Sequence, residues 1–149
     1  MAKISLNQYF KQLAGLVNDG AFEAVIGHAQ HILKTYPRNV ATYRYLGQAL
    51  LGKARYKEAG DIFLRVLSSV PDDLLAHAGM TEVYKDQRQV DRAIWHLERA
   101  FEQAPNNVAI QDELRELYAR CGFRTWLREL EGEAPRPRAR IARPRPHQP

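Results

Sequence analysis

Three prolines recur at a fixed spacing and constrain the fold more than any other feature of this sequence. Pro37, Pro71 and Pro105 lie 34 residues apart, and each follows a stretch of helix-favouring residues. Proline cannot continue a helix, because it lacks the backbone N–H and its ring collides with the preceding turn. A constant period of this length predicts a stacked array of helical repeats. In such an array we expect the functional residues to lie on an extended surface.

A second set of four residues recurs with the same period, and three of them lie two residues after one of the prolines. Its members are polar and short, as the start of a helix requires, because their side chains can accept a hydrogen bond from an unpaired N–H of the first turn. We therefore predict one helix start after each of Ser5, Asn39, Asp73 and Asn107.

Each repeat must also break in its middle to form two helices. Gly20 and Gly122 share one mid-repeat phase and suit the left-handed turn that ends a helix. Ala54 and Arg88 hold this phase in the other two repeats, where the predicted break depends on weaker signals.

Apolar residues follow the same period. Small side chains recur at Ala59 and Ala93, and large ones at Phe63 and Leu97, with spacings of three and four inside each repeat. This spacing places them on one face of a helix, where alternating sizes allow close packing. Further positions of this predicted core are Leu16, Ile32, Tyr43, Leu46, Leu50, Val66, Met80, Tyr84, Ala100, Leu114 and Tyr118.

With these positions the sequence resembles the tetratricopeptide repeat (TPR) family. The second repeat carries most of the family pattern, in Tyr43, Leu46, Gly47, Leu50, Ala59, Phe63, Val66 and Pro71. The third repeat departs from it at His77 and Thr81, and the first at Gln12 and Val25.

The resemblance implies an all-α fold, a right-handed superhelical array of antiparallel helix pairs. We expect a repeat domain at 1–131 with three units and a C-terminal capping helix, followed by a separate tail at 132–149. The units are 6–39, 40–73 and 74–107, and the cap is 108–131. The predicted helices are 6–19 with 21–35, 40–53 with 56–69, 74–87 with 90–103, and then 108–121.

The tail differs in composition from the rest of the chain. Residues 132–149 carry a net charge of +4 out of the total of +5, and they contain five prolines. Such a segment is expected to be disordered when free. It is interpreted either as a solvated tail or linker, or as an arm that binds nucleic acid or another anionic partner. The arginines of that arm are Arg136, Arg138, Arg140, Arg143 and Arg145.

The sequence offers little for catalysis. His28 and His31 lie on one predicted helix without an obvious third metal ligand, and Cys121 has no histidine or second cysteine near it in sequence. We therefore expect no enzyme activity, no metal and no cofactor. The single cysteine and the lack of a long apolar stretch favour a cytoplasmic location without a membrane span.

The resemblance implies that the first helix of each repeat lines a concave groove, and we expect this groove to bind a partner peptide or helix. Some family members hold the terminal carboxylate of heat-shock chaperones with a basic and asparagine clamp. That clamp is absent here, because its positions hold Phe10, Ala14, Tyr45, Leu75 and Gly79. Self-association is a further possibility. The predicted groove residues are Asn7, Phe10, Lys11, Val17, Asn18, Arg44, Tyr45, Gln48, Leu51, Leu75, Glu82, Lys85, Asp86, Asp112, Glu116 and Arg120.

Overall fold

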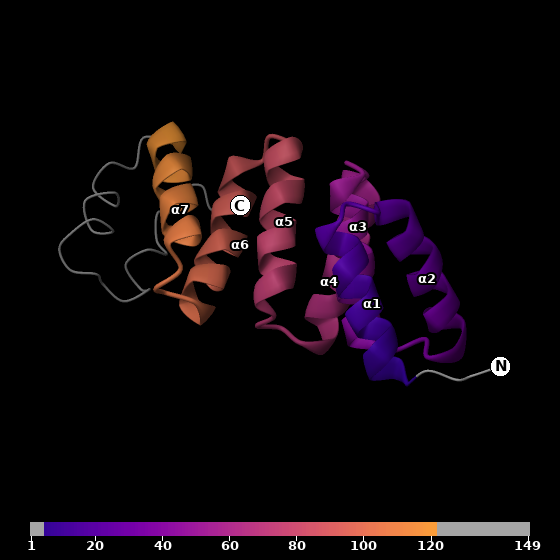
Figure 1. Cartoon of the computed structure of the whole chain (residues 1–149). Helices are drawn as coiled ribbons and strands as arrows, with labels where there is room; N and C mark the ends of the chain where they lie inside the picture. The colour runs from indigo at the N-terminus through magenta and orange to yellow at the C-terminus, as the bar shows by residue number, and fades with distance from the viewer. Residues whose placement is uncertain (1–4, 122–149) are drawn as a thin grey trace. The chain divides into compact units, whose positions relative to one another are not determined.

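The computed structural model of the chain describes residues 5–121, and these residues form seven α-helices and no strand (Figure 1). Every helix agrees with its predicted range to within one residue, so the all-α class and the helix pairs are confirmed. The helices are α1 (Leu6–Asn18), α2 (Phe22–Thr35), α3 (Val40–Gly52), α4 (Tyr56–Ser69), α5 (Leu74–Asp86), α6 (Val90–Gln103) and α7 (Val108–Cys121).

The helices form two compact units, and the division between them follows the repeats. The first unit ends at Pro71 and contains α1 to α4, and the second begins at Asp72 and contains α5 to α7. We call them unit 1 and unit 2. The predicted single domain at 1–131 and the tail at 132–149 remain predictions, because residues 122–149 lie outside the described part of the chain.

The four predicted helix starts are confirmed. Asn39 accepts a hydrogen bond from the backbone N–H of Thr42 at 2.8 Å, and Asp73 accepts one from the N–H of Ala76 at 3.0 Å. Ser5 and Asn107 make the equivalent bonds at 3.2 Å and 3.1 Å. Each side chain replaces one of the backbone bonds that the first turn of a helix lacks.

The turns inside the three repeats are also confirmed, and they share one backbone geometry, while Gly122 lies outside the described residues. Gly20, Ala54 and Arg88 have φ angles of +76°, +60° and +61°. In the second repeat the N–H of Ala54 bonds to the carbonyl of Leu51, and the N–H of Arg55 bonds to the carbonyl of Leu50, both at 2.9 Å. This is the Schellman pattern, which ends a helix with one left-handed residue. At the second and third turns that residue carries a side chain and is therefore strained.

The core of unit 1 lies between the paired helices. Phe63 and Val25 are fully buried, with Leu50 and Val66 close to that limit. The Phe63 ring packs against Gly47 so closely that a Cβ added there would lie 2.6 Å from the ring. The glycine therefore sets how near α3 and α4 can come to each other.

The core of unit 2 is built by α6 and α7, with Tyr84 of α5 packed against it. Leu97, Leu114 and Tyr118 are buried, and the Tyr118 hydroxyl donates a hydrogen bond of 2.7 Å to the carboxylate of Glu98. Most of the predicted core positions are buried in the two units. Leu16, Tyr43 and Tyr84 are the exceptions, because they stay partly accessible to solvent.

Two of the repeat prolines share an unexpected contact. The Tyr43 hydroxyl donates a hydrogen bond of 2.9 Å to the carbonyl of Pro37, and the side-chain amide of Gln111 donates one of 2.8 Å to the carbonyl of Pro105. Tyr43 and Gln111 hold the same phase of the repeat. In these two repeats the position therefore fixes the proline turn, once with a phenol and once with an amide.

Candidate functional site

The exposed sides of α1 and α3 form the first candidate surface, which we call the N-terminal A face. At its centre the rings of Phe10 and Tyr45 pack together, with centroids 5.8 Å apart and planes tilted by 31°. Both rings are half-buried, so each keeps part of its surface in water. The predicted groove residues on this face are all exposed or half-buried: Asn7, Phe10, Lys11, Val17, Asn18, Arg44, Tyr45, Gln48 and Leu51.

Polar side chains surround the ring pair. Asn7 and Lys11 lie one turn apart on α1 and are exposed, and Gln48 lies three residues after Tyr45 on α3. Neither helix contains a single aspartate or glutamate. The N-terminal A face is therefore aromatic at its centre and carries only positive charge.

The second candidate surface lies on α5 and α7 in unit 2, and we call it the C-terminal A face. Lys85 links the two helices through an ion pair of 2.7 Å with Glu113, and it lies 3.7 Å from Glu82. The predicted groove residues on this face are again exposed or half-buried: Leu75, Glu82, Lys85, Asp86, Asp112, Glu116 and Arg120.

The pKa values of Glu82 and Lys85 are shifted, because several carboxylates lie near one amine. Burial raises the pKa of Glu82, and the nearby charge of Glu113 adds to this effect against the opposing charge of Lys85. Burial alone would lower the pKa of Lys85, but the hydrogen bond and charge of Glu113, with Glu82 and Glu116, raise it above its ordinary value. The amine is thus held in its charged form by partners that it already has.

The described parts of the two units carry opposite net charges. Residues 5–71 contain eight lysines and arginines against four aspartates and glutamates, a net charge of +4. Residues 72–121 contain six against ten, a net charge of −4. The near neutrality expected for the repeat region is correct as a sum, but it hides this division. Counting charge on either side of Pro71, with Asp72 and Asp73 included in the second half, was the signal that could have revealed it.

An aromatic cluster between α5 and α6 was missed by sequence reasoning. The Nδ1 atoms of His77 and His96 lie 3.0 Å apart, and the ring of Tyr84 stacks on His96 at 5.5 Å. Burial, followed by the charges of His77 and Arg99, lowers the pKa of His96 to about 4. One ring must donate to the other in this contact, so the two Nδ1 atoms cannot both carry a proton.

A signal for this cluster was present in the sequence. Tyr9 and His28 occupy the positions of His77 and His96 two repeats earlier, and the Tyr9 hydroxyl lies 2.9 Å from Nδ1 of His28. The family pattern marks the departure at His77 but not its partner on the second helix of the repeat.

Trp95 is the largest exposed aromatic side chain among residues 72–121, with half of its surface accessible. The guanidinium of Arg99 lies over its ring at 4.8 Å and pairs with Glu102 at 2.8 Å. His96 meets the indole edge-on at 4.9 Å. The exposed indole is therefore held in place by contacts on several sides.

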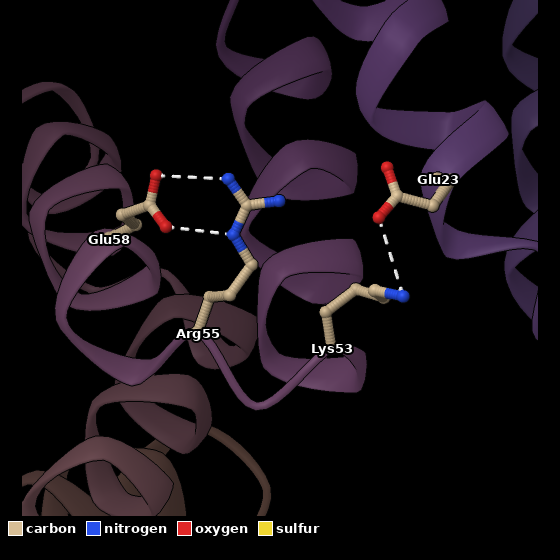
Figure 2. A network of polar contacts seen from close by, with 4 residues as sticks. All are labelled: Glu23, Lys53, Arg55 and Glu58. Carbon is tan, nitrogen blue, oxygen red and sulfur yellow. Dashed lines mark hydrogen bonds and ion pairs between the residues drawn. The ribbon is translucent and has the colours of Figure 1, made fainter.

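A surface network of ion pairs joins the turn after α3 to its neighbours (Figure 2). Arg55 donates two hydrogen bonds to the carboxylate of Glu58, from Nε and Nη2. Lys53 forms an ion pair with Glu23, at the start of α2, with 3.3 Å between Nζ and Oε2. The hydrogen bond from Arg55 lowers the pKa of Glu58. These four side chains are exposed, and exposed pairs of this kind stabilise little, so the network offers no chemistry beyond local ordering.

The remaining candidates for chemistry do not assemble into a site. His28 and His31 are both exposed on α2, and the described residues contain no group of three metal-ligating side chains. Burial raises the pKa of the Cys121 thiol, which disfavours the reactive thiolate. The five arginines of the predicted anion-binding arm lie outside the described residues.

The positions of the chaperone clamp are occupied as the sequence indicated. Phe10 and Tyr45 form the ring pair, Ala14 is half-buried beside them on α1, and Gly79 is buried on α5.

Comparisons with known proteins identify the fold. No family model matches the sequence, and no curated protein does. Among solved structures, MamA 41-end from Desulfovibrio magneticus RS-1 matches 81% of this chain and 68% of its own, with a TM-score of 0.71 and 20% identity. A MamA RS-1 ArsTM double mutant matches 76% of this chain and 64% of its own, with a TM-score of 0.68 and 20% identity.

A third match extends the same conclusion. The structure of Naa15/Naa10 bound to HypK-THB covers 80% of this chain but only 18% of that chain, with a TM-score of 0.66 and 19% identity. These are TPR-like helical repeats, so the matches agree with the helix-pair fold. Across residues 5–121, no helix is both long and apolar enough to cross a membrane.

Proposed function

We propose that this chain is a non-enzymatic protein-interaction module that binds an extended or helical segment of a partner on the A faces of its repeats. The observation that supports this most directly is the Phe10–Tyr45 pair, which presents two partly exposed rings side by side on α1 and α3. Aromatic residues dominate the binding energy of many interfaces, because they bury a large area with little loss of side-chain freedom.

The fold supports the same proposal. Helical-repeat proteins use the first helices of neighbouring repeats as extended binding surfaces, and within unit 1 the helices α1 and α3 contact each other. The A faces keep all sixteen predicted groove residues at least partly accessible.

A peptide-display selection on the full chain tests the proposal. Peptides enriched on the wild-type protein are measured against Tyr45→Ala, which removes one ring of the pair. The matched control is Tyr36→Ala, because Tyr36 is half exposed in the same unit but lies at the end of α2. We expect Tyr45→Ala to weaken binding by about tenfold or more and Tyr36→Ala to leave it unchanged. Equal effects of the two substitutions, or no enriched peptide at all, would refute the proposal.

A further inference from the structure

The ring pair and the charge of unit 1 together indicate what kind of segment the N-terminal A face binds. We infer that the partner segment is acidic and places an aromatic or large aliphatic side chain against Phe10 and Tyr45. This inference rests on the proposed function and specifies its partner.

The first argument is electrostatic. With no carboxylate on α1 or α3 and a net charge of +4 over residues 5–71, the potential at this face is positive. The acidic residues of unit 1 lie in turns or on the second helices of the repeats, and two of them, Glu23 and Glu58, are engaged by Lys53 and Arg55. A positive face attracts acidic segments and repels basic ones.

The second argument concerns the anchor. The two rings pack together with centroids 5.8 Å apart, and both keep part of their surface in water, so one further apolar group can pack against them and complete a small cluster. A terminal carboxylate alone would bury little apolar area against the two rings. The bound segment must therefore offer apolar area as well as charge.

The polar side chains next to the rings suit such a segment. Asn7 and Lys11 are spaced i and i+4 on α1, so they lie on one face of that helix. Along the helix axis, Phe10 lies between them. Lys11 can pair with a carboxylate that flanks the anchor, and the amides of Asn7 and Gln48 can bond to an extended backbone.

The C-terminal A face does not share this preference. Its central cation, Lys85, is already paired with Glu113 and lies near Glu82, and α5 and α7 carry five acidic residues against three basic ones. An acidic segment would meet an excess of like charge there. The predicted site is therefore confined to unit 1.

The test measures fluorescence anisotropy with three short labelled peptides and the full chain. One probe alternates aspartate and glutamate around a central phenylalanine, the second replaces this phenylalanine with glycine, and the third replaces every acid with lysine. The protein variants are Lys11→Glu on the face, Lys57→Glu on α4, Arg140→Glu in the tail, and Tyr45→Ala. The three charge variants have the same net charge, so they separate a local contact from general attraction, including attraction to the arginines of the tail.

We expect the acidic phenylalanine probe to bind at least about tenfold more tightly than either other probe, and Lys11→Glu to weaken it by about tenfold. Lys57→Glu and Arg140→Glu are expected to stay within about twofold of wild type at moderate salt, because exposed charges away from the site are screened. Far-ultraviolet circular dichroism confirms that each variant remains helical.

Two results would overturn the inference. Equal losses in the three charge variants would show that only the overall charge attracts the probe. Preferential binding of the lysine probe, weakened by Tyr45→Ala, would reject the acidic partner while leaving the A face as a binding surface. The proposed function itself is decided by the display selection: it fails if no peptide is enriched, or if Tyr45→Ala and Tyr36→Ala affect the enriched peptides equally.

Discussion

The left-handed residue in the middle of each repeat leads to a stability prediction whose sign depends on the backbone alone. Ala54 has a φ of +60°, and this conformation costs an L-residue about 1–2 kcal/mol. Glycine avoids this cost but adds about 0.4–1 kcal/mol of chain entropy to the unfolded state. Ala54→Gly should therefore stabilise unit 1 by about 0.5–1 kcal/mol, measured as a shift in the urea unfolding curve followed by ellipticity at the helix band.

The reverse substitution at the equivalent position provides the control. Gly20→Ala introduces the same strain at φ +76° and should destabilise the protein by a similar amount. A Cβ at Gly20 would have no neighbour within 4 Å, and the same is true at Gly27 in the interior of α2. Gly27→Ala should therefore stabilise by about 1 kcal/mol through helix propensity, opposite in sign to Gly20→Ala. If Ala54→Gly destabilises, or if the two alanine substitutions change stability in the same direction, the assignment of strain to these turns is wrong.

Three further predictions concern packing, acid stability and capping. Gly47→Ala should destabilise by about 2 kcal/mol, because its Cβ would collide with the Phe63 ring, and urea unfolding would measure the loss. The pKa of His96 falls from 6.5 to about 4 on folding, so the unfolded state binds a proton more readily in that range. Stability should thus be complete above about pH 6.5 and decline as the pH falls towards 4, by up to about 3 kcal/mol, and His96→Gln should flatten this profile in unfolding curves. Asn39→Ala removes a helix cap and should cost about 1 kcal/mol, seen as a lower thermal midpoint.

The sequence predicts the helices well because their ends are encoded locally. A cap such as Asn39 and a break such as Pro37 act within a few residues, and their period makes each prediction support the others. Ala54 and Arg88 show how far this support extends: neither residue favours a left-handed turn, yet both adopt it. Neighbouring helices that pack on either side impose the turn that Gly20 encodes by itself.

The candidate site is less predictable, because it depends on pairs of residues that are distant in sequence. Phe10 and Tyr45 were each predicted to line the groove, but no spacing rule states that their rings touch. The contact between His77 and His96 was missed for the same reason, since each side chain is explained only by the other. The limit is physical: a period fixes which helix faces meet, while side-chain rotamers fix which atoms do.

The hydrogen bonds that Tyr43 and Gln111 donate to the proline carbonyls have a consequence for how such a chain can change. A phenol and an amide reach the same kind of acceptor from the same phase, so the junctions at Pro37 and Pro105 are each closed by a hydrogen bond from a different side chain. A substitution of the donor side chain changes the strength of that hydrogen bond, while the helix lengths and the spacing of the other repeats stay as they are. The stability of one junction can thus change by a single substitution, while the 34-residue period of the array stays the same.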